Sequence, residues 1–252
     1  MHFYDARGKG ELPTIVLLHG IGSAATPFGR VMLALRDRAR RVIVPDAVAH
    51  GFSATPRDPL TFERLLAATT ELLDAELEEP AVVFGSSLGG GVALRYTLAR
   101  PDRVRGVMVC SPAGAGMSAE DMAALVATFR LESRSEARAF VRRLYHQPPW
   151  WSPLIAPDVQ ALFSRPAIRD LLSAARPEHA FTPEELGALR VPTLLLWGRS
   201  DRVLPRDLLQ FFRKHLPGHA QIEEPDDFGH CPHLDRPQAL ADRIASFARG
   251  LL

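Results

Sequence analysis

The chain has 252 residues, of which 46% are hydrophobic, and a formal net charge of +1 from 30 basic and 29 acidic side chains. This length and apolar content suffice for one well-buried core. The balanced charge, with no basic run, argues against nucleic acid as a partner. Cys110 and Cys231 are too few for a disulfide framework and lack the spacing of a metal site, which fits a reducing compartment.

The N-terminal stretch MHFYDARGKGEL is polar and charged, whereas a signal peptide needs an apolar centre. No apolar run approaches the length that spans a bilayer. We therefore expect a soluble cytoplasmic protein with no stable membrane insertion.

Short apolar, β-branched runs alternate with helical stretches along the chain. The runs lie at residues 14–18, 41–45, 81–84, 104–110 and 192–197, with a weaker one at 219–224. Residues 61–77 carry their apolar side chains on one stripe, which predicts an amphipathic crossover helix. Near-continuous apolar strands are typical of parallel sheets covered on both faces. The pattern predicts a doubly wound, mostly parallel α/β sheet.

Residues 112–189 interrupt this alternation because they contain helix starts and no convincing strand. Ser133 to Glu136 and Thr182 to Glu185 have the form of capping boxes. The proline-rich stretch at 147–157 is interpreted as a bend between helices. We expect a helical cap at 112–189, inserted into a core formed by residues 1–111 and 190–252.

The stretch FGSSLGGG at 84–91 holds two adjacent serines between a strand and a helix. GSSLG at 85–89 fits G-x-S-x-G, the nucleophile elbow, in which the residues two positions from the centre must be small. A turn centred on Ser86 would place Phe84 and Leu88 at those positions. The pattern therefore favours Ser87 as nucleophile, with Ser86 as a small neighbour bordering the pocket.

A serine nucleophile needs a base and an acid that orients the base. In the fold that carries this nucleophile turn, the three residues follow along the chain in the order Ser, Asp or Glu, His. His230 follows the last strand and is favoured over His233, which lies nearer a helix start. Asp201 follows the strand at 192–197, at the sheet edge where ligands gather. A surface pairing of Asp201 with Arg199 or Arg202 is the structural explanation that competes with this role, and Asp226 and Asp227 are weaker candidates for the acid.

The oxyanion of acyl transfer needs backbone donors. We expect the amides of Leu88 and Ile21 to supply them. Ile21 lies in the loop HGIG at 19–22, where His19 supports the loop and His19 and Gly20 border the substrate.

Together, HG at 19–20, PDAVAHGFS at 45–53, GSSLG at 85–89, WGRSD at 197–201 and GHCPHLDRP at 229–237 resemble the capped α/β-hydrolase superfamily. The resemblance spans nearly the whole core in the expected order, although PDAVAHGFS lacks the proline and glycine that commonly precede HG. A serine nucleophile argues against haloalkane dehalogenases and epoxide hydrolases, which use a carboxylate. The serine nucleophile implies a mechanism that passes through an acyl-enzyme. C-C bond hydrolases also use serine, but a tryptophan commonly follows their histidine, where this chain has Cys231.

The predicted cap is similar to that of monoacylglycerol-lipase-like esterases. Trp150 and Trp151 are candidates for lining an acyl channel or touching a lipid surface; packing of the cap on the core explains them equally well. Two further features have ordinary explanations. The row Arg134, Arg138, Arg142 and Arg143 fits a solvated helix face or, as in pimeloyl-carrier methyl esterases, a surface for an acyl-carrier protein. His230, His233 and Asp235 lack the helix-borne spacing of a zinc site.

The sequence thus predicts a serine esterase without cofactor or metal that acts on small or medium acyl esters. The competing classes are a C-C bond hydrolase, an acyl-carrier ester or thioester hydrolase, and a hydrolase-like receptor that binds a ligand with little turnover.

Overall fold

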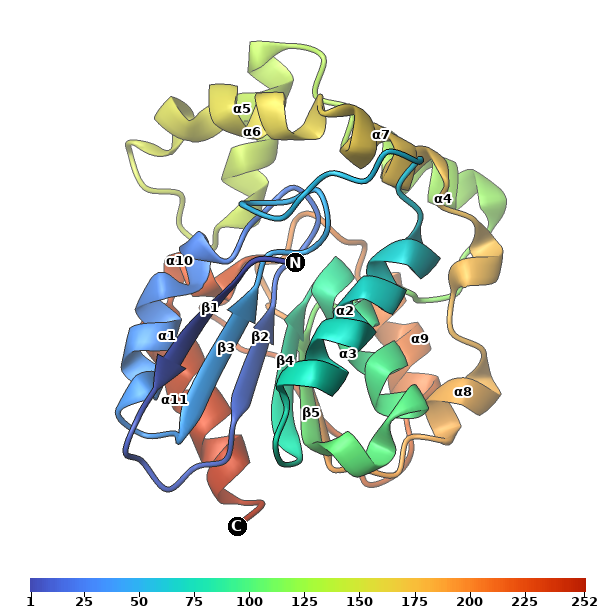
Figure 1. Ribbon diagram of the computed structural model, residues 1–252. Helices are drawn as coiled ribbons and strands as arrows, with labels where there is room; N and C mark the ends of the chain where they lie inside the picture. The colour runs from blue at the N-terminus through green and yellow to red at the C-terminus, as the bar shows by residue number, and fades with distance from the viewer.

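The computed structural model describes all residues from 1 to 252 and is built around a seven-stranded sheet (Figure 1). The strand order is β1-β3-β2-β4-β5-β6-β7, and every neighbouring pair is parallel except β1 with β3. The strands are β1 (Phe3–Arg7), β2 (Ile15–Leu18), β3 (Arg41–Pro45), β4 (Ala81–Ser86), β5 (Val104–Cys110), β6 (Thr193–Leu196) and β7 (Gln221–Glu223). This is the α/β-hydrolase architecture that the sequence predicts.

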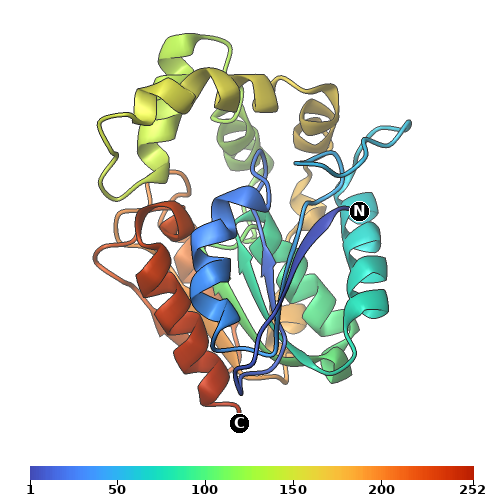
Figure 2. The same cartoon turned by 60° about the vertical axis from the view of Figure 1, so that its left-hand side comes forward.

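Helices cover both faces of the sheet because its central strands are apolar on both sides (Figure 2). Ile15 and Leu17 pack with the helices of one face, and Val16 and Leu18 pack with those of the other. The first face carries α1 (Gly29–Arg36) and α11 (Pro237–Arg249); the second carries α2 (Phe62–Glu76), α3 (Leu88–Ala99) and α9 (Asp207–His215).

The segment between β5 and β6 contains helices and no strand; α4 to α7 lie above the carboxyl ends of the strands, whereas α8 lies beside α9 (Figures 1 and 2). Both expected capping boxes are present: Ser133 opens α5 with Glu136, and Thr182 opens α8 with Glu185. The main helices of this segment are α4 (Ala119–Ala127), α5 (Arg134–Leu144), α6 (Ala156–Phe163), α7 (Pro166–Ser173) and α8 (Pro183–Gly187).

The structure differs from the sequence-based expectation in two places. The stretch 147–157 is only partly a bend, because it contains the short 3-10 helix η3 (Ser152–Ile155) and the start of α6; Pro153 fits here because an early helical position needs no N–H donor. β1 was not expected. It is an edge strand whose side chains are partly exposed, so it lacks the apolar run that reveals the buried strands.

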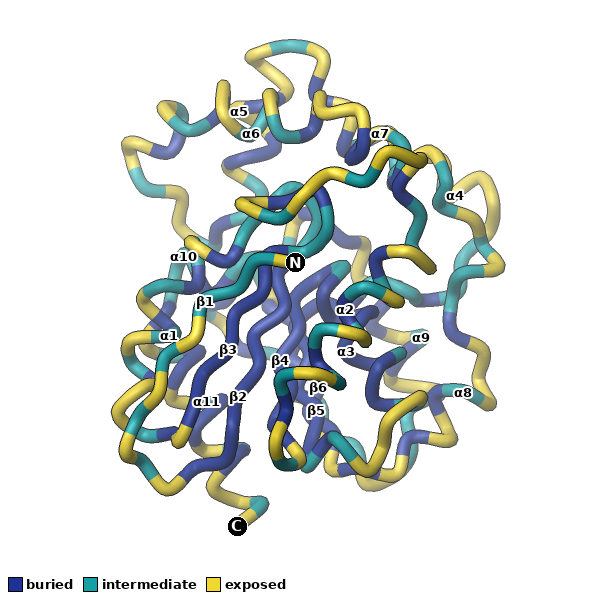
Figure 3. The backbone as a smooth tube through the Cα atoms, in the orientation of Figure 1, coloured by how far each residue is buried: buried dark blue, intermediate teal, exposed yellow.

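The remaining elements are short: η1 (Thr26–Phe28), η2 (Pro101–Arg103), η4 (Pro177–His179) and α10 (Pro232–Asp235). Burial is concentrated along the strands, whereas the outer surface of the helical segment is largely exposed (Figure 3). None of the helices combines the length and the apolar character needed to cross a membrane.

Candidate active site

Ser87 lies at the apex of a sharp turn between β4 and α3. Its φ of 54° and ψ of −121° are unfavourable for a residue with a side chain, which marks local strain. The turn is held by several backbone bonds: the Ser87 amide donates to Cys110 O at 3.0 Å, and the Ser87 carbonyl accepts from the amides of Gly90, Gly91 and Ala113. These bonds compensate the strain and keep the residue in place.

The glycines on either side explain why the turn is centred on Ser87. A Cβ on Gly85 would lie 2.2 Å from the Gly89 carbonyl oxygen, and one on Gly89 would lie 2.4 Å from that of Leu18. Strand and helix approach too closely there for any side chain. Ser86 is instead the last residue of β4, fully buried and outside the main cavity.

His230 and Asp201 form a buried pair at the same edge of the sheet. Their loops follow β7 and β6, and His230 Nδ1 lies 2.8 Å from Asp201 Oδ2. The other carboxylate oxygen, Oδ1, accepts from the amides of Val203 and Leu204 at 2.8 and 3.1 Å. The carboxylate therefore fixes the orientation of the imidazole. No hydrogen bond joins Ser87 Oγ to His230, and such contacts often form fully only with substrate bound.

The charge of Asp201 is stabilised although its side chain is buried. Burial alone raises the pKa of this carboxyl, but the charge and hydrogen bond of His230 and the Val203 amide outweigh it and hold the pKa below its ordinary 3.8. Ser111 Oγ lies against the same carboxylate without reaching a sound hydrogen-bond geometry. An ionised partner for His230 is therefore present at neutral pH.

The rival candidates for base and acid lie elsewhere. His233 is buried, stacks on Phe28 with 4.2 Å between ring centroids, and its Nδ1 has no partner. Burial lowers the pKa of His233 to about 3, so it stays neutral. Asp226 is exposed and pairs with Arg199. Asp227 pairs with Arg236.

Two buried histidines support the loop that contains Ile21. His19 Nδ1 donates to Gly20 O at 2.8 Å while its Nε2 accepts from the Ala47 amide at 3.0 Å. His50 Nε2 likewise accepts from the Gly22 amide at 3.2 Å. Burial lowers the pKa of both rings, that of His50 to about 4, which keeps each in the neutral form these bonds require. The amides of Ile21 and Leu88 have no acceptor within the chain.

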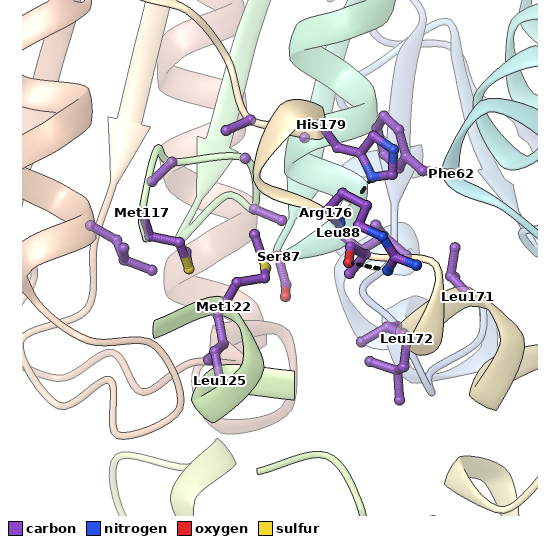
Figure 4. A pocket seen from close by; sticks show the side chains of 18 of the residues that line it. Phe62, Ser87, Leu88, Met117, Met122, Leu125, Leu171, Leu172, Arg176 and His179 are labelled. Carbon is purple, nitrogen blue, oxygen red and sulfur yellow. Dashed lines mark hydrogen bonds between the residues drawn. The ribbon is translucent and has the colours of Figure 1, made fainter. Parts of the chain in front are cut away.

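A largely apolar cavity opens at Ser87, between the sheet edge and the helical segment (Figure 4). Of its 23 lining residues, 17 are hydrophobic, so it is suited to an apolar substrate group. Ile21 and Leu88 line it together with Ser87. Most of the lining comes from helices and from the loops between them, and no periodicity in the sequence shows that these residues meet at one cavity: Phe62, Met117, Met122, Leu125, Phe129, Leu171, Leu172, Arg176 and His179.

Other predicted substrate contacts do not line this cavity. His19 and Gly20 border a smaller hollow, which Leu88 shares. Trp150 is 88% exposed and lies beside Arg142 in a separate surface depression, and Trp151 is also exposed. The structure therefore does not place either tryptophan at Ser87.

Both cysteine thiols are poorly suited to act as nucleophiles. Burial raises the pKa of Cys110 and that of Cys231 well above the usual thiol range, which keeps the unreactive protonated form. Cys231 directly follows His230, where its amide donates to Leu144 O.

Residues 15–243 match the model of the alpha/beta hydrolase family. The chain is 27% identical over 249 residues to a pimeloyl-[acyl-carrier protein] methyl ester esterase of Neisseria meningitidis, covering 94% of each chain, and 26% identical to Lipase 1 of Psychrobacter immobilis, covering 97% of this chain and 79% of the lipase. A solved 2-hydroxy-6-oxo-6-phenylhexa-2,4-dienoate hydrolase from Rhodococcus shares the fold, with a TM-score of 0.82 and 24% identity over 96% of this chain and 92% of that one.

Proposed function

The chain belongs to the alpha/beta hydrolase family, and from this membership we propose that it is a serine hydrolase that cleaves small or medium acyl esters through an acyl-enzyme. The observation that carries the proposal is the strained Ser87 in the wall of an apolar cavity, at the same sheet edge as the His230–Asp201 pair. Residues 112–189 act as the cap that covers this cavity.

The first half of the reaction forms the acyl-enzyme. Ser87 Oγ attacks the ester carbonyl carbon while His230 Nε2 takes the hydroxyl proton. Asp201 accepts the hydrogen bond from His230 Nδ1–H and stabilises the imidazolium that forms. The amides of Ile21 and Leu88 bind the oxyanion, and His230 returns the proton to the departing alcohol.

The second half releases the acid. His230 takes a proton from water, the resulting hydroxide attacks the acyl carbon, and the Ser87–acyl bond breaks with return of the proton to Ser87 Oγ. The apolar lining favours the hydrocarbon part of the acyl chain, because burying it removes apolar surface from water.

The relatives support an ester substrate: one is named a methyl ester esterase and another a lipase. The first also favours a carrier-bound ester as a second candidate. Arg134, Arg138 and Arg142 are exposed and so accessible to an acyl-carrier protein, whereas Arg143 donates to the carbonyls of Arg202 and Val203.

Steady-state hydrolysis of p-nitrophenyl esters from acetate to palmitate tests the proposal. We expect sustained turnover with a maximum at one chain length. Ser87→Ala removes the nucleophile and should lower kcat on the order of a million-fold, as for comparable triads. Ser86→Ala is the matched control, because Ser86 lies outside the cavity.

Near wild-type turnover in Ser87→Ala would overturn the serine mechanism. A single stoichiometric burst in the wild type would favour the receptor interpretation over the esterase. A monomethyl ester presented on an acyl-carrier protein, assayed beside the free ester, separates the carrier-bound candidate from the small-molecule one.

A further inference from the structure

One side of the cavity carries basic side chains among its apolar ones. Figure 4 shows Met117, Met122 and Leu125 on one side of Ser87, and Arg176 and His179 on the other together with Leu88, Leu171 and Leu172. Hydrophobic side chains alone explain affinity for an acyl chain. They do not explain a guanidinium in the wall of such a cavity, because a cation is poorly matched to an apolar ligand.

The other arginine in the wall, Arg95, is fully engaged. It forms an ion pair with Glu185, donates to the carbonyls of His179 and Ala180, and lies 4.2 Å from the centroid of the Phe181 ring. These contacts compensate its charge and hold helix α3 against the η4–α8 segment. Arg95 is therefore explained by structure and leaves no free donor face for a ligand.

Arg176 is engaged only in part. Its Nη1 donates to the carbonyls of Ser173 and Ala175 at 2.7 and 2.8 Å, at the end of α7. Its Nε and Nη2 have no acceptor, and it forms no ion pair. The side chain is exposed at the rim of the cavity. One nitrogen thus orients the guanidinium while the rest of its planar donor face remains open, an arrangement suited to a carboxylate.

The neighbouring histidine does not compete for this role. His179 Nδ1 accepts from the Arg176 amide at 3.3 Å, and its Nε2 lies 3.3 Å from Glu63. Glu63 therefore has its own partner and does not neutralise Arg176. The rim keeps one uncompensated positive charge beside an apolar surface.

We propose that Arg176 is a specificity-determining residue that binds a carboxylate carried by the substrate, so that the preferred esters have an apolar chain ending in an anionic group. The proposal rests on the proposed function, with Ser87 at the scissile ester. The apolar walls on both sides of Ser87 hold the hydrocarbon chain, and Arg176 at the rim binds the carboxylate.

The test compares matched ester pairs that differ only in the terminal carboxylate. The p-nitrophenyl monoesters of adipic and suberic acid are assayed against the p-nitrophenyl esters of hexanoic and octanoic acid. We expect Arg176→Gln to lower the ratio of kcat/KM for the anionic ester to that for the neutral ester by about three- to tenfold, mainly through KM, because the bidentate contact is charge-assisted but exposed. Arg176→Lys should recover part of the ratio, and added salt should reduce it in the wild type because the rim is exposed.

Arg169→Gln is the matched control, because Arg169 is an exposed arginine on α7 that does not line the cavity. A wild type without preference for the anionic esters, or the same ratio in Arg176→Gln and Arg169→Gln, would overturn the proposal. Using the ratio cancels any general loss of folded protein.

A binding measurement separates this inference from the proposed reaction. Ser87→Ala and Ser87→Ala/Arg176→Gln are titrated calorimetrically with monomethyl adipate and with methyl hexanoate. We expect tighter binding of monomethyl adipate only when Arg176 is present. That result supports carboxylate recognition even if no ester is turned over, whereas equal binding by both proteins contradicts it even if Ser87 proves to be the nucleophile.

Discussion

Gly89 has no Cβ, and this allows the close backbone approach that positions Ser87, the candidate nucleophile. Its Cα lies where α3 begins to pass the end of β2, and an added Cβ would lie 2.4 and 2.5 Å from the carbonyl oxygens of Leu18 and His19. These oxygens belong to backbone, which cannot rotate away as a flexible side chain can. The close approach lets the Ser87 turn sit directly beside the loop that contains Ile21.

We expect Gly89→Ala to lower the free energy of unfolding by about 2–3 kcal/mol, because helix and strand must separate to admit the methyl group. The same movement displaces Ser87, so ester turnover should fall more than stability alone explains. Urea unfolding and kcat/KM measured on the same preparations check both effects.

Gly187 provides the control for this substitution. It lies in α8, is exposed, and an added Cβ would meet nothing within 4 Å. Gly187→Ala should leave stability unchanged or raise it by up to about 1 kcal/mol, since alanine loses less conformational freedom in a helix than glycine. Equal losses in the two variants would contradict the steric explanation.

At this scale the sequence is most informative where a backbone constraint excludes other residue types. The small residues at 85 and 89 distinguish Ser87 from Ser86, and chain order directs attention to Asp201, which the structure places against His230. Arg176 has no such signal. Its importance depends on which carbonyls and carboxylates lie around it in space, and no local pattern encodes that.

At the scale of elements, the end of α5 is attached to both loops that carry the candidate base and acid. The Leu144 carbonyl accepts from the Cys231 amide at 3.0 Å, in the His230 loop. Arg202, next to Asp201, donates to the carbonyls of Tyr145 and His146 at 2.8 and 3.0 Å. The helical segment therefore contributes to the position of the His230–Asp201 pair as well as covering the cavity.

Arg202→Ala removes two charge-assisted hydrogen bonds to this segment and tests the attachment. We expect kcat/KM for p-nitrophenyl esters to fall by roughly tenfold, because the Asp201 turn loses its link to α5 and His230 is held less firmly. The pH profile of kcat/KM should shift at the same time, which simple loss of folded protein would not produce.

Arg199→Ala is the comparison, because Arg199 lies in the same turn but pairs with the exposed Asp226. Exposed ion pairs contribute little, so this variant should behave like the wild type. Identical kinetics in both variants would mean that the contacts of α5 do not affect the pair.

The packing of the helical segment is harder to predict from the sequence than the core. Capping boxes at Ser133 and Thr182 are local hydrogen-bond patterns, so their helix starts are visible in the sequence. How α4 and α7 turn their apolar faces toward Ser87 depends on contacts far apart in the chain. The same holds for α6, whose Phe163 lies against Gly22, where a Cβ would come within 2.5 Å of the ring.

For the whole molecule, buried neutral histidines link folding stability to pH. The pKa of His50 is lowered to about 4 and that of His233 to about 3, in both cases mainly because burial disfavours the charged ring. In the unfolded chain both rings titrate near their ordinary value of 6.5. Below that pH the unfolded chain binds protons that the folded protein does not, so acidification favours unfolding.

We expect the free energy of unfolding to fall by about 2 kcal/mol for each of these histidines between about pH 6.5 and pH 5, since each pKa unit corresponds to about 1.4 kcal/mol. Above about pH 6.5 their contribution should be constant. Urea unfolding at about pH 7 and about pH 5 measures the difference.

His50→Gln identifies the source of this pH dependence. The glutamine side chain has an oxygen that can accept from the Gly22 amide and a nitrogen that can donate to the Val48 carbonyl, as the neutral imidazole does. Unlike the imidazole, this side chain does not titrate. The variant should lose about 2 kcal/mol less than the wild type on acidification. If both lose the same amount, protonation of His50 is not what weakens the fold, and the acid lability must arise from His233 or from the other buried groups. A smaller loss in His50→Gln would instead identify protonation of His50, which accepts from the Gly22 amide, as a source of the acid lability.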